Sequence, residues 1–269
     1  MHKKFSGRLF KKELKSLWIM LIIFIAIISM YVGVIISMFD PTAAGILDQF
    51  AKDMPQMMAA VGMSAGATTL TGFMASYLYG FILLIVPLIF TIICANNLVA
   101  RYTDRGSLVS LLAAPIKRSA VALTQMWVLL FCIVILIAYT TGLQIIVAQA
   151  YFPNQLVIGQ LLLLNLGLLC LHLFIGGICF LCSCAFNDVK NSLTYGAGIP
   201  LVMYILQAMA NMGGKVENVK YATFFSLFNT TNILAWHPYA FWEYGTLGLG
   251  TIVLFWIAIA VFSKKNLNI

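Results

Sequence analysis

Long, uninterrupted apolar runs dominate the chain and are separated by short polar stretches. Each run is long enough to cross the roughly 30 Å hydrocarbon layer of a bilayer as a helix. Strands of a membrane barrel would instead alternate apolar and polar positions over short segments, so the unbroken runs favour helices. The pattern predicts an all-α polytopic membrane protein with six transmembrane helices, at residues 17–39, 73–98, 121–149, 157–184, 193–212 and 244–262.

Composition supports this class. Of the 269 residues, 62% are hydrophobic and 9% are charged, whereas soluble domains carry about 25% charged residues. No internal repeat or composition change marks a boundary, so we expect one membrane domain over residues 1–269. The first apolar run is too long for a signal-peptide core, so we expect it to remain in the mature protein.

The positive charges are distributed unevenly between the two predicted sides of the membrane. With six spans, three of the sixteen basic residues fall on one side: Lys52, Lys215 and Lys220. The other side holds Lys3, Lys4, Arg8, Lys11, Lys12, Lys15, Arg101, Arg105, Lys117, Arg118, Lys190, Lys264 and Lys265. Positive residues favour the cytoplasmic side, which predicts a multi-pass protein of the cell membrane with both termini in the cytoplasm. Because these charges flank membrane segments, we expect no nucleic-acid partner.

No Asp, Glu, Lys or Arg falls in the middle of a predicted span. Ion-coupled carriers usually need such groups at membrane depth, and membrane-embedded hydrolases usually need carboxylates, a His pair or an activated serine. The chain also lacks the GxxxxGK[ST] phosphate loop. We therefore expect that the chain is not an enzyme, and that active transport would need a separate ATPase subunit.

Several uncharged polar residues do lie in or near the spans. Two interpretations stay open: they hydrogen-bond between helices, or they line a path for an amphipathic substrate. The candidates for such a path are Gln144, Asn165 and Gln207.

Six cysteines lie in or at the ends of spans, so no disulfide framework is indicated. Cys179, Cys182 and Cys184 are closely spaced, and His172 precedes Cys179 by seven residues. A metal or redox site is one interpretation. Cysteine as a small apolar packing residue is the interpretation we favour, and we expect no metal.

The N-terminal residues 1–16 combine an apolar side with many basic residues. This pattern predicts a cytoplasmic amphipathic helix at the inner face of the membrane, although a basic flank that only sets topology would look similar. Its apolar side is formed by Phe5, Leu9, Phe10 and Leu14.

The polar segment between the second and third predicted spans, residues 101–118, contains a short helical pattern. Ser107 can cap a helix that Pro115 ends, and three leucines share one face of it. Such a helix either lies on lipid or docks in a partner's groove. The residues concerned are Asp104, Arg105, Gly106, Ser107, Leu108, Leu111, Leu112, Pro115, Lys117 and Arg118.

The region from Phe73 to Trp127 resembles the permease subunits of ABC-2-type (type V) ABC transporters. Their corresponding loop has a glycine, a leucine, a Leu-Leu pair, a proline and a terminal arginine in this order. The matching positions are Gly106, Leu108, Leu111, Leu112, Pro115 and Arg118.

The resemblance implies that this segment is a coupling helix that fits a cleft in an ATPase subunit. It also implies a second permease subunit, identical or related, and no cofactor in this chain, since ATP and Mg would bind the ATPase. The expected substrate is hydrophobic or amphipathic: a drug, an antimicrobial or toxic peptide, or a lipid. The aromatic-rich residues 213–243 would form re-entrant helices between the last two spans, unless they form an interfacial belt.

Two other functions remain open. One is a secondary carrier or channel that needs no ATPase. The other is a membrane-embedded enzyme that uses the cluster of His172, Cys179, Cys182 and Cys184.

Overall fold

The computed structural model describes residues 6–40, 53–63, 69–100 and 118–264, and every regular element within these ranges is a helix. Six helices are long and apolar enough to cross a membrane, which confirms the predicted six-helix pattern. They are α1 Gly7–Ser37, the continuous helix of α4 Leu70–Tyr77, η1 Leu78–Ile82 and α5 Leu83–Leu98, then α8 Arg118–Tyr151, α9 Ile158–Ala185, α10 Val189–Asn211 and α12 Tyr239–Lys264.

Four short helices complete the described part of the chain. The helix α3 (Pro55–Ala60) precedes the second long helix. Two 3₁₀ helices, η2 (Gly214–Ala222) and η3 (Phe224–Leu227), and the short α11 (Thr230–Leu234) connect α10 to α12.

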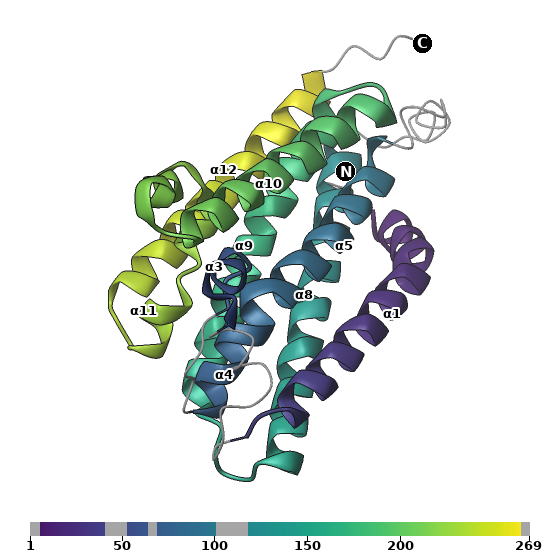
Figure 1. The fold of residues 1–269 in the computed structure, drawn as a ribbon. Helices are drawn as coiled ribbons and strands as arrows, with labels where there is room; N and C mark the ends of the chain where they lie inside the picture. Colours follow the sequence, from purple (N-terminus) through teal and green to yellow (C-terminus); the bar gives the residue numbers. More distant parts are fainter. Residues whose placement is uncertain (1–5, 41–52, 64–68, 101–117, 265–269) are drawn as a thin grey trace.

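The long helices run up and down, so the bundle has two distinct ends (Figure 1). At one end α1 begins, α5 ends, α8 begins and α12 ends; we call it the terminal end. At the other end lie α3, α4, η2, η3 and α11; we call it the cavity end, for the cavity described below.

The helix α9 is the centre of the bundle, because it packs against α5, α8, α10 and α12. Glycines bring α9 and α12 close together. A Cβ at Gly177 would meet Leu254 at 3.0 Å, and one at Gly250 would meet Phe174 at 2.6 Å. Small residues at such seams let helix backbones approach closely, which drives packing where lipid removes the hydrophobic effect.

The peripheral helices leave apolar side chains uncovered. Ile19 of α1 is 72% exposed and Trp256 of α12 is 71% exposed. Exposed apolar area on this scale is unfavourable in water. Together with the six apolar helices, these side chains fit a protein whose outer surface faces lipid.

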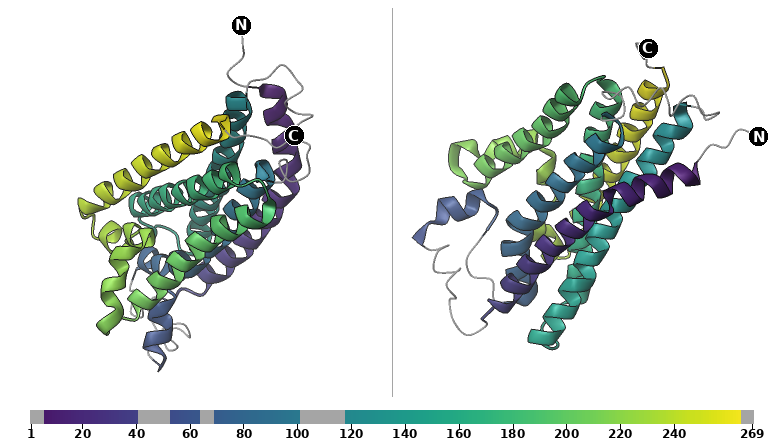
Figure 2. Two further views of the ribbon diagram at one scale, coloured as in Figure 1. Left: turned by 90° about the horizontal axis from the view of Figure 1, so that it is seen from above. Right: turned by 90° about the vertical axis from the view of Figure 1, so that its right-hand side faces the viewer.

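The first helix, α1, is continuous from Gly7, and its first turns bend away from the rest (Figure 2). The reason for this continuity is local, since no proline interrupts residues 7–37 and Ser6 caps the first turn by accepting a hydrogen bond from the Leu9 amide. The amphipathic N-terminal segment over residues 1–16 and the start of the first span at residue 17 remain predictions, because a continuous helix does not show where the membrane begins.

Part of the apolar side of this segment is also covered by protein. Leu9 is buried, Leu14 is half-buried, and the Phe10 ring packs edge-on against Phe131 of α8 with 5.7 Å between the ring centres. Phe5 lies outside the described residues.

Candidate functional site: a polar cavity at one end of the bundle

The cavity end encloses a space of about 550 Å³ between α3, η1, α10 and the short helices that follow α10. Volumes of this size are typical of ligand-binding clefts. Its lining combines apolar side chains, among them Phe225 and Phe228, with hydroxyl, amide and ammonium groups. The polar lining residues are Ser76, Tyr79, Gln207, Asn211, Lys220, Ser226, Asn229, Thr230 and Thr231.

An irregular turn of the second long helix forms part of the wall. Residues Leu78–Ile82 adopt a π-helix, and Tyr79 and Gly80 within it line the cavity. Wide turns of this kind inside α-helices are frequent at functional sites.

Gly80 also holds α3 against the cavity. A Cβ at Gly80 would lie 2.6 Å from the Gly62 carbonyl oxygen, so no larger residue fits between the two backbones. Gly62 itself has a φ of 75°, a left-handed conformation that glycine adopts without strain. These two glycines therefore fix the turn after α3 at the cavity's edge.

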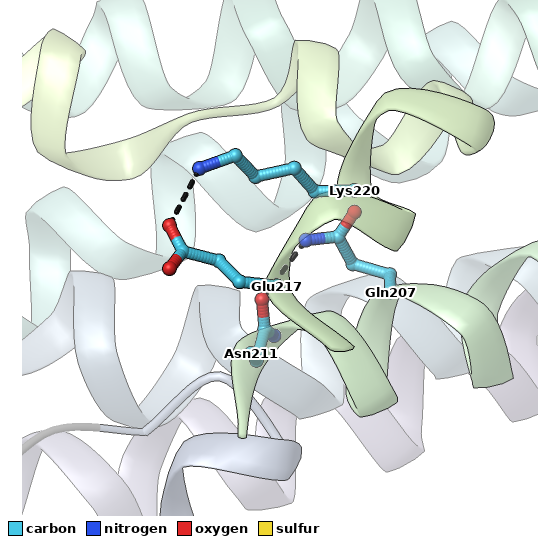
Figure 3. Close-up of polar contacts among 4 residues, drawn as sticks. All are labelled: Gln207, Asn211, Glu217 and Lys220. Carbon is cyan, nitrogen blue, oxygen red and sulfur yellow. Dashed lines mark hydrogen bonds and ion pairs between the residues drawn. The ribbon is translucent and has the colours of Figure 1, made fainter. Parts of the chain in front are cut away.

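Two polar pairs lie on α10 and η2, and three of their four residues line the cavity (Figure 3). On η2, the Lys220 Nζ donates to Glu217 Oε1 at 2.8 Å, and on the last turns of α10 the Gln207 Nε2 donates to Asn211 Oδ1 at 2.9 Å. The hydrogen bond from Lys220 lowers the pKa of Glu217, and the same bond raises the pKa of Lys220. The charged group that lines the cavity is thus already neutralised by an acidic neighbour.

Behind the cavity wall lies a buried network of three side chains. The Tyr79 hydroxyl donates to Gln144 Oε1 at 2.9 Å, and the Asn165 Nδ2 donates to the same oxygen at 2.9 Å. Gln144 is 0% exposed and Asn165 is 3% exposed. Each lies seven residues, about 10 Å, inside its helix end. The network therefore joins three long helices well inside the bundle.

Two atoms of this network have no hydrogen-bond partner. Gln144 Oε1 accepts twice, while Gln144 Nε2 and Asn165 Oδ1 are buried and unpaired. A buried polar group left unpaired costs about 1–3 kcal/mol. The network reaches the cavity through Tyr79, which lines it, whereas Gln144 and Asn165 lie behind the lining.

Two of the three residues named for a substrate path are therefore brought together. Gln144 and Asn165 share a hydrogen bond, whereas Gln207 lines the cavity itself. Tyr79, which links the cavity to the network, was not singled out by the sequence, because a tyrosine in an apolar run carries no distinguishing signal. Neither the π-helix nor the contact between Gly62 and Gly80 has a signature in the sequence.

The histidine and cysteine cluster is not assembled into a site. His172 places its ring nitrogens 2.9 Å from the Leu168 carbonyl oxygen and 3.2 Å from that of Leu84, and the Cys179 thiol donates to the Gly196 carbonyl at 3.1 Å. Within the described part of the chain, no three His, Cys, Asp or Glu side chains form a group that could hold a metal ion. His172, Cys179, Cys182 and Cys184 all belong to that part.

The predicted coupling segment lies almost entirely outside the described residues. Its positions from Asp104 to Lys117 are not described, and Arg118 begins α8.

The aromatic connection between α10 and α12 forms short helices, and its aromatic residues divide into two groups. Phe225 and Phe228 are buried in the bundle, where they face the cavity. Tyr221, Trp236 and Trp242 are largely exposed. The connection therefore supplies a cavity wall on one side and an aromatic outer surface on the other.

Compared with models of known protein families and with curated proteins, the chain matches none.

Proposed function

We propose that this chain is the membrane-spanning permease subunit of an ATP-driven ABC-2-type exporter. It would move a hydrophobic or amphipathic substrate out across the cell membrane, while a separate subunit hydrolyses ATP. A second permease subunit completes the pathway, and ATP and Mg bind the ATPase partners. In this proposal both termini are cytoplasmic, so the cavity end faces outward.

One observation carries the proposal: a single helix connects the cavity wall to the segment that resembles a coupling helix. Tyr79, Gly80 and Leu84 line the cavity, and the same helix continues to Leu98, immediately before that segment. From Tyr79 to Leu98 is about 28 Å at 1.5 Å per residue. Because α8 begins at Arg118, a push on residues 101–118 would act on both flanking helices at once.

The lack of charged residues in the central parts of the long helices supports a separate ATPase as the energy source. In the described ranges, the central parts of the six long helices contain no Asp, Glu, Lys or Arg. A carrier driven by protons or sodium ions would need an ionisable group at that depth. Polar amides and a tyrosine suit an amphipathic cargo better than an ion.

The test is to purify the tagged chain from native membranes and identify co-purifying proteins by mass spectrometry. We expect an ATPase subunit with the native chain, and its loss from the double variant Leu111→Asp, Leu112→Asp. Placing two carboxylates in an apolar groove should cost at least about 3 kcal/mol, or about 100-fold in affinity.

The matched control is Leu111→Met, Leu112→Met, which keeps both side chains apolar and should retain the ATPase. Size-exclusion chromatography checks that each variant is folded. If no ATPase appears even after mild crosslinking, the proposal is wrong. Transport by the chain alone in liposomes would then identify a carrier or channel that needs no ATPase.

A further inference from the structure

Pro200 interrupts the backbone hydrogen bonding of α10 at its midpoint. It is the central residue of the 23-residue helix Val189–Asn211. In an α-helix each amide donates to the carbonyl four residues earlier, but proline has no amide hydrogen, so the Gly196 carbonyl lacks its usual donor. The Cys179 thiol of α9 donates to this same carbonyl at 3.1 Å. A neighbouring helix thus supplies the hydrogen bond that Pro200 removes, which is how a proline is tolerated inside a membrane helix.

The part of α10 before the proline, residues 189–199, is anchored to α9, and we call it the anchored half. Only residues 186–188 separate the end of α9 from the start of α10. The Ser192 hydroxyl oxygen lies 3.1 Å from that of Ser183 on α9, and both residues are buried. Gly196 is buried as well, one turn further along the same face. Side-chain bonds and small residues therefore hold this half of the helix close to α9.

The part of α10 after the proline, residues 201–211, is held less tightly, and we call it the cavity half. The structure describes all of it, and Ala210 is the one residue within it that is buried. Val202 and Ile205 are exposed apolar residues. A segment with few buried contacts moves more readily than one that is packed on several sides.

The cavity half of α10 also forms part of the cavity wall. Gln207 and Asn211 line the cavity. The Tyr204 ring packs edge-on against Phe225, another lining residue, with 5.6 Å between the ring centres. Beyond Asn211 the chain continues into η2 and η3, which supply further lining residues. A bend in the middle of α10 would therefore shift one side of the cavity relative to the other helices.

We propose that residues 196–200 of α10 are a hinge, about which the cavity half swings to open and close the cavity while the anchored half stays on α9. Cys179 is a positioning residue, because its thiol binds the carbonyl that the proline leaves without an amide and so fixes the stationary side of the hinge. A bend of about 20°, usual at a proline, moves Met209, about 14 Å beyond Pro200, by about 5 Å. The inference goes beyond the proposed function, since it concerns access to the cavity whatever drives it.

Distances between two spin labels, measured by pulsed electron paramagnetic resonance on the purified full chain in lipid nanodiscs, test the hinge. The labels are attached to p-acetylphenylalanine, so every native cysteine stays in place. One label is at Leu162 near the start of α9, and the other is at Met209 in the cavity half or at Leu193 in the anchored half; all three positions are exposed. We expect two populations about 5 Å apart for Leu162 and Met209, and one narrow population for Leu162 and Leu193.

A proline substitution tests the hinge itself. Pro200→Ala restores the amide that donates to Gly196, and an uninterrupted helix does not bend at this point. The distance between Leu162 and Met209 should then collapse to one population. Pro87→Ala is the matched control, because Pro87 also lies inside a long helix, α5. This variant should keep both populations.

Substitutions of Cys179 test the role of the thiol. In Cys179→Ala the anchored half loses its bond to α9, so the distance between Leu162 and Leu193 should become broader than in the native chain. Cys179→Ser keeps a hydrogen-bond donor at this position and should restore the narrow distance. Unchanged Leu193 distances in Cys179→Ala would show that the thiol does not fix the hinge.

A single narrow distance between Leu162 and Met209 in the native chain overturns the inference, and this result needs no variant to fold. Two populations that persist in Pro200→Ala overturn it as well. So does a Leu193 distance that varies as widely as the Met209 distance, because α10 would then move as a whole. None of these measurements involves an ATPase. Failure of the hinge is therefore distinguishable from failure of the exporter proposal, which is tested by co-purification.

Discussion

Buried polar residues along one side of α9 make different hydrogen bonds near its two ends. Asn165, His172 and Cys179 follow one another at intervals of seven residues, which keeps them on nearly one face. Near the cavity end, Asn165 bonds to a side chain of another helix and keeps an unpaired oxygen. Toward the terminal end, His172 and Cys179 contact backbone carbonyls.

The difference shows that residue type alone does not identify a binding site. Histidine and cysteine side chains are chemically more reactive than those of asparagine and glutamine, yet the polar atoms of His172 and Cys179 contact backbone carbonyls. The Gln144 and Asn165 amides instead bond to each other and, through Gln144, to Tyr79, which lines the cavity. A side-chain network that reaches the cavity therefore distinguishes these residues from His172 and Cys179.

The largest expected effect is the loss of stability caused by a substitution at the cavity end. In Gly80→Ala the new Cβ would lie 2.6 Å from the Gly62 carbonyl oxygen and 2.8 Å from its carbonyl carbon, and these backbone atoms cannot rotate away. We expect the variant to displace the turn after α3 and to lower stability by about 1–3 kcal/mol. Thermal unfolding in detergent measures the change.

Gly142→Ala is the matched control. Gly142 lies in α8 and a Cβ there would meet nothing within 4 Å, so the variant should be neutral or slightly stabilising. Equal effects of the two changes would contradict the tight contact between Gly62 and Gly80.

The next largest effect is the loss of stability in Gln144→Met, which tests the network of Tyr79, Gln144 and Asn165. Gln144→Met preserves the side-chain length but removes the oxygen that accepts from Tyr79 and Asn165. The Tyr79 hydroxyl then loses its acceptor, while the Asn165 Nδ2 keeps its bond to the Leu161 carbonyl at 3.0 Å. We expect a loss of about 1–2 kcal/mol in the free energy of unfolding. Thermal or denaturant unfolding of the purified chain measures it.

Cys179→Ala provides the contrast, since it removes one weak thiol donor to a backbone carbonyl. It should lower the free energy of unfolding by less than Gln144→Met does. A larger loss of stability in Cys179→Ala than in Gln144→Met would contradict the contrast between the two positions.

The smallest expected effect is the pH dependence of stability that comes from the pair of Glu217 and Lys220. The pKa of Glu217 lies below its ordinary value of 4.5, because Lys220 donates a hydrogen bond to it. The contribution of the pair is therefore present above pH 4.5 and is lost as the pH falls through the lowered pKa. The pKa of Lys220 is raised above 10.5, so the contribution is also lost as the pH rises through that raised value.

Because the pair is solvent-exposed, the change in melting temperature should be small. It is measured between pH 3 and pH 7 on the native chain and on Glu217→Gln, which does not titrate. The variant should lack the part of the acid-induced decrease that Glu217 causes. If the melting temperature depended on pH identically in the native chain and in Glu217→Gln, the pair of Glu217 and Lys220 would contribute nothing measurable to stability.

The sequence predicted the spans well, because a long apolar run is a property of consecutive residues. The predicted and observed bounds agree within a few residues for the second to sixth helices, for example 157–184 against Ile158–Ala185. In the first helix the backbone is helical from Gly7, and the predicted start of the span at residue 17 stays a prediction.

The candidate site was predictable in part. Gln144, Asn165 and Gln207 stood out as uncharged polar residues in apolar surroundings, and two of them meet in one network. Their assignment as a substrate path remains a prediction. Tyr79 could not be chosen among the tyrosines, because its importance comes from the π-helical turn and from a partner 65 residues away.

By itself, the sequence determined that this is a helical membrane protein with six apolar helices, since transfer of each run into lipid depends on its own composition. Only the tertiary structure decided which polar atoms are paired and which remain free. The rotation of each helix about its axis, the π-helical turn at Tyr79 and the backbone contact at Gly80 all depend on packing between segments distant in the chain. The cavity exists only where those segments meet.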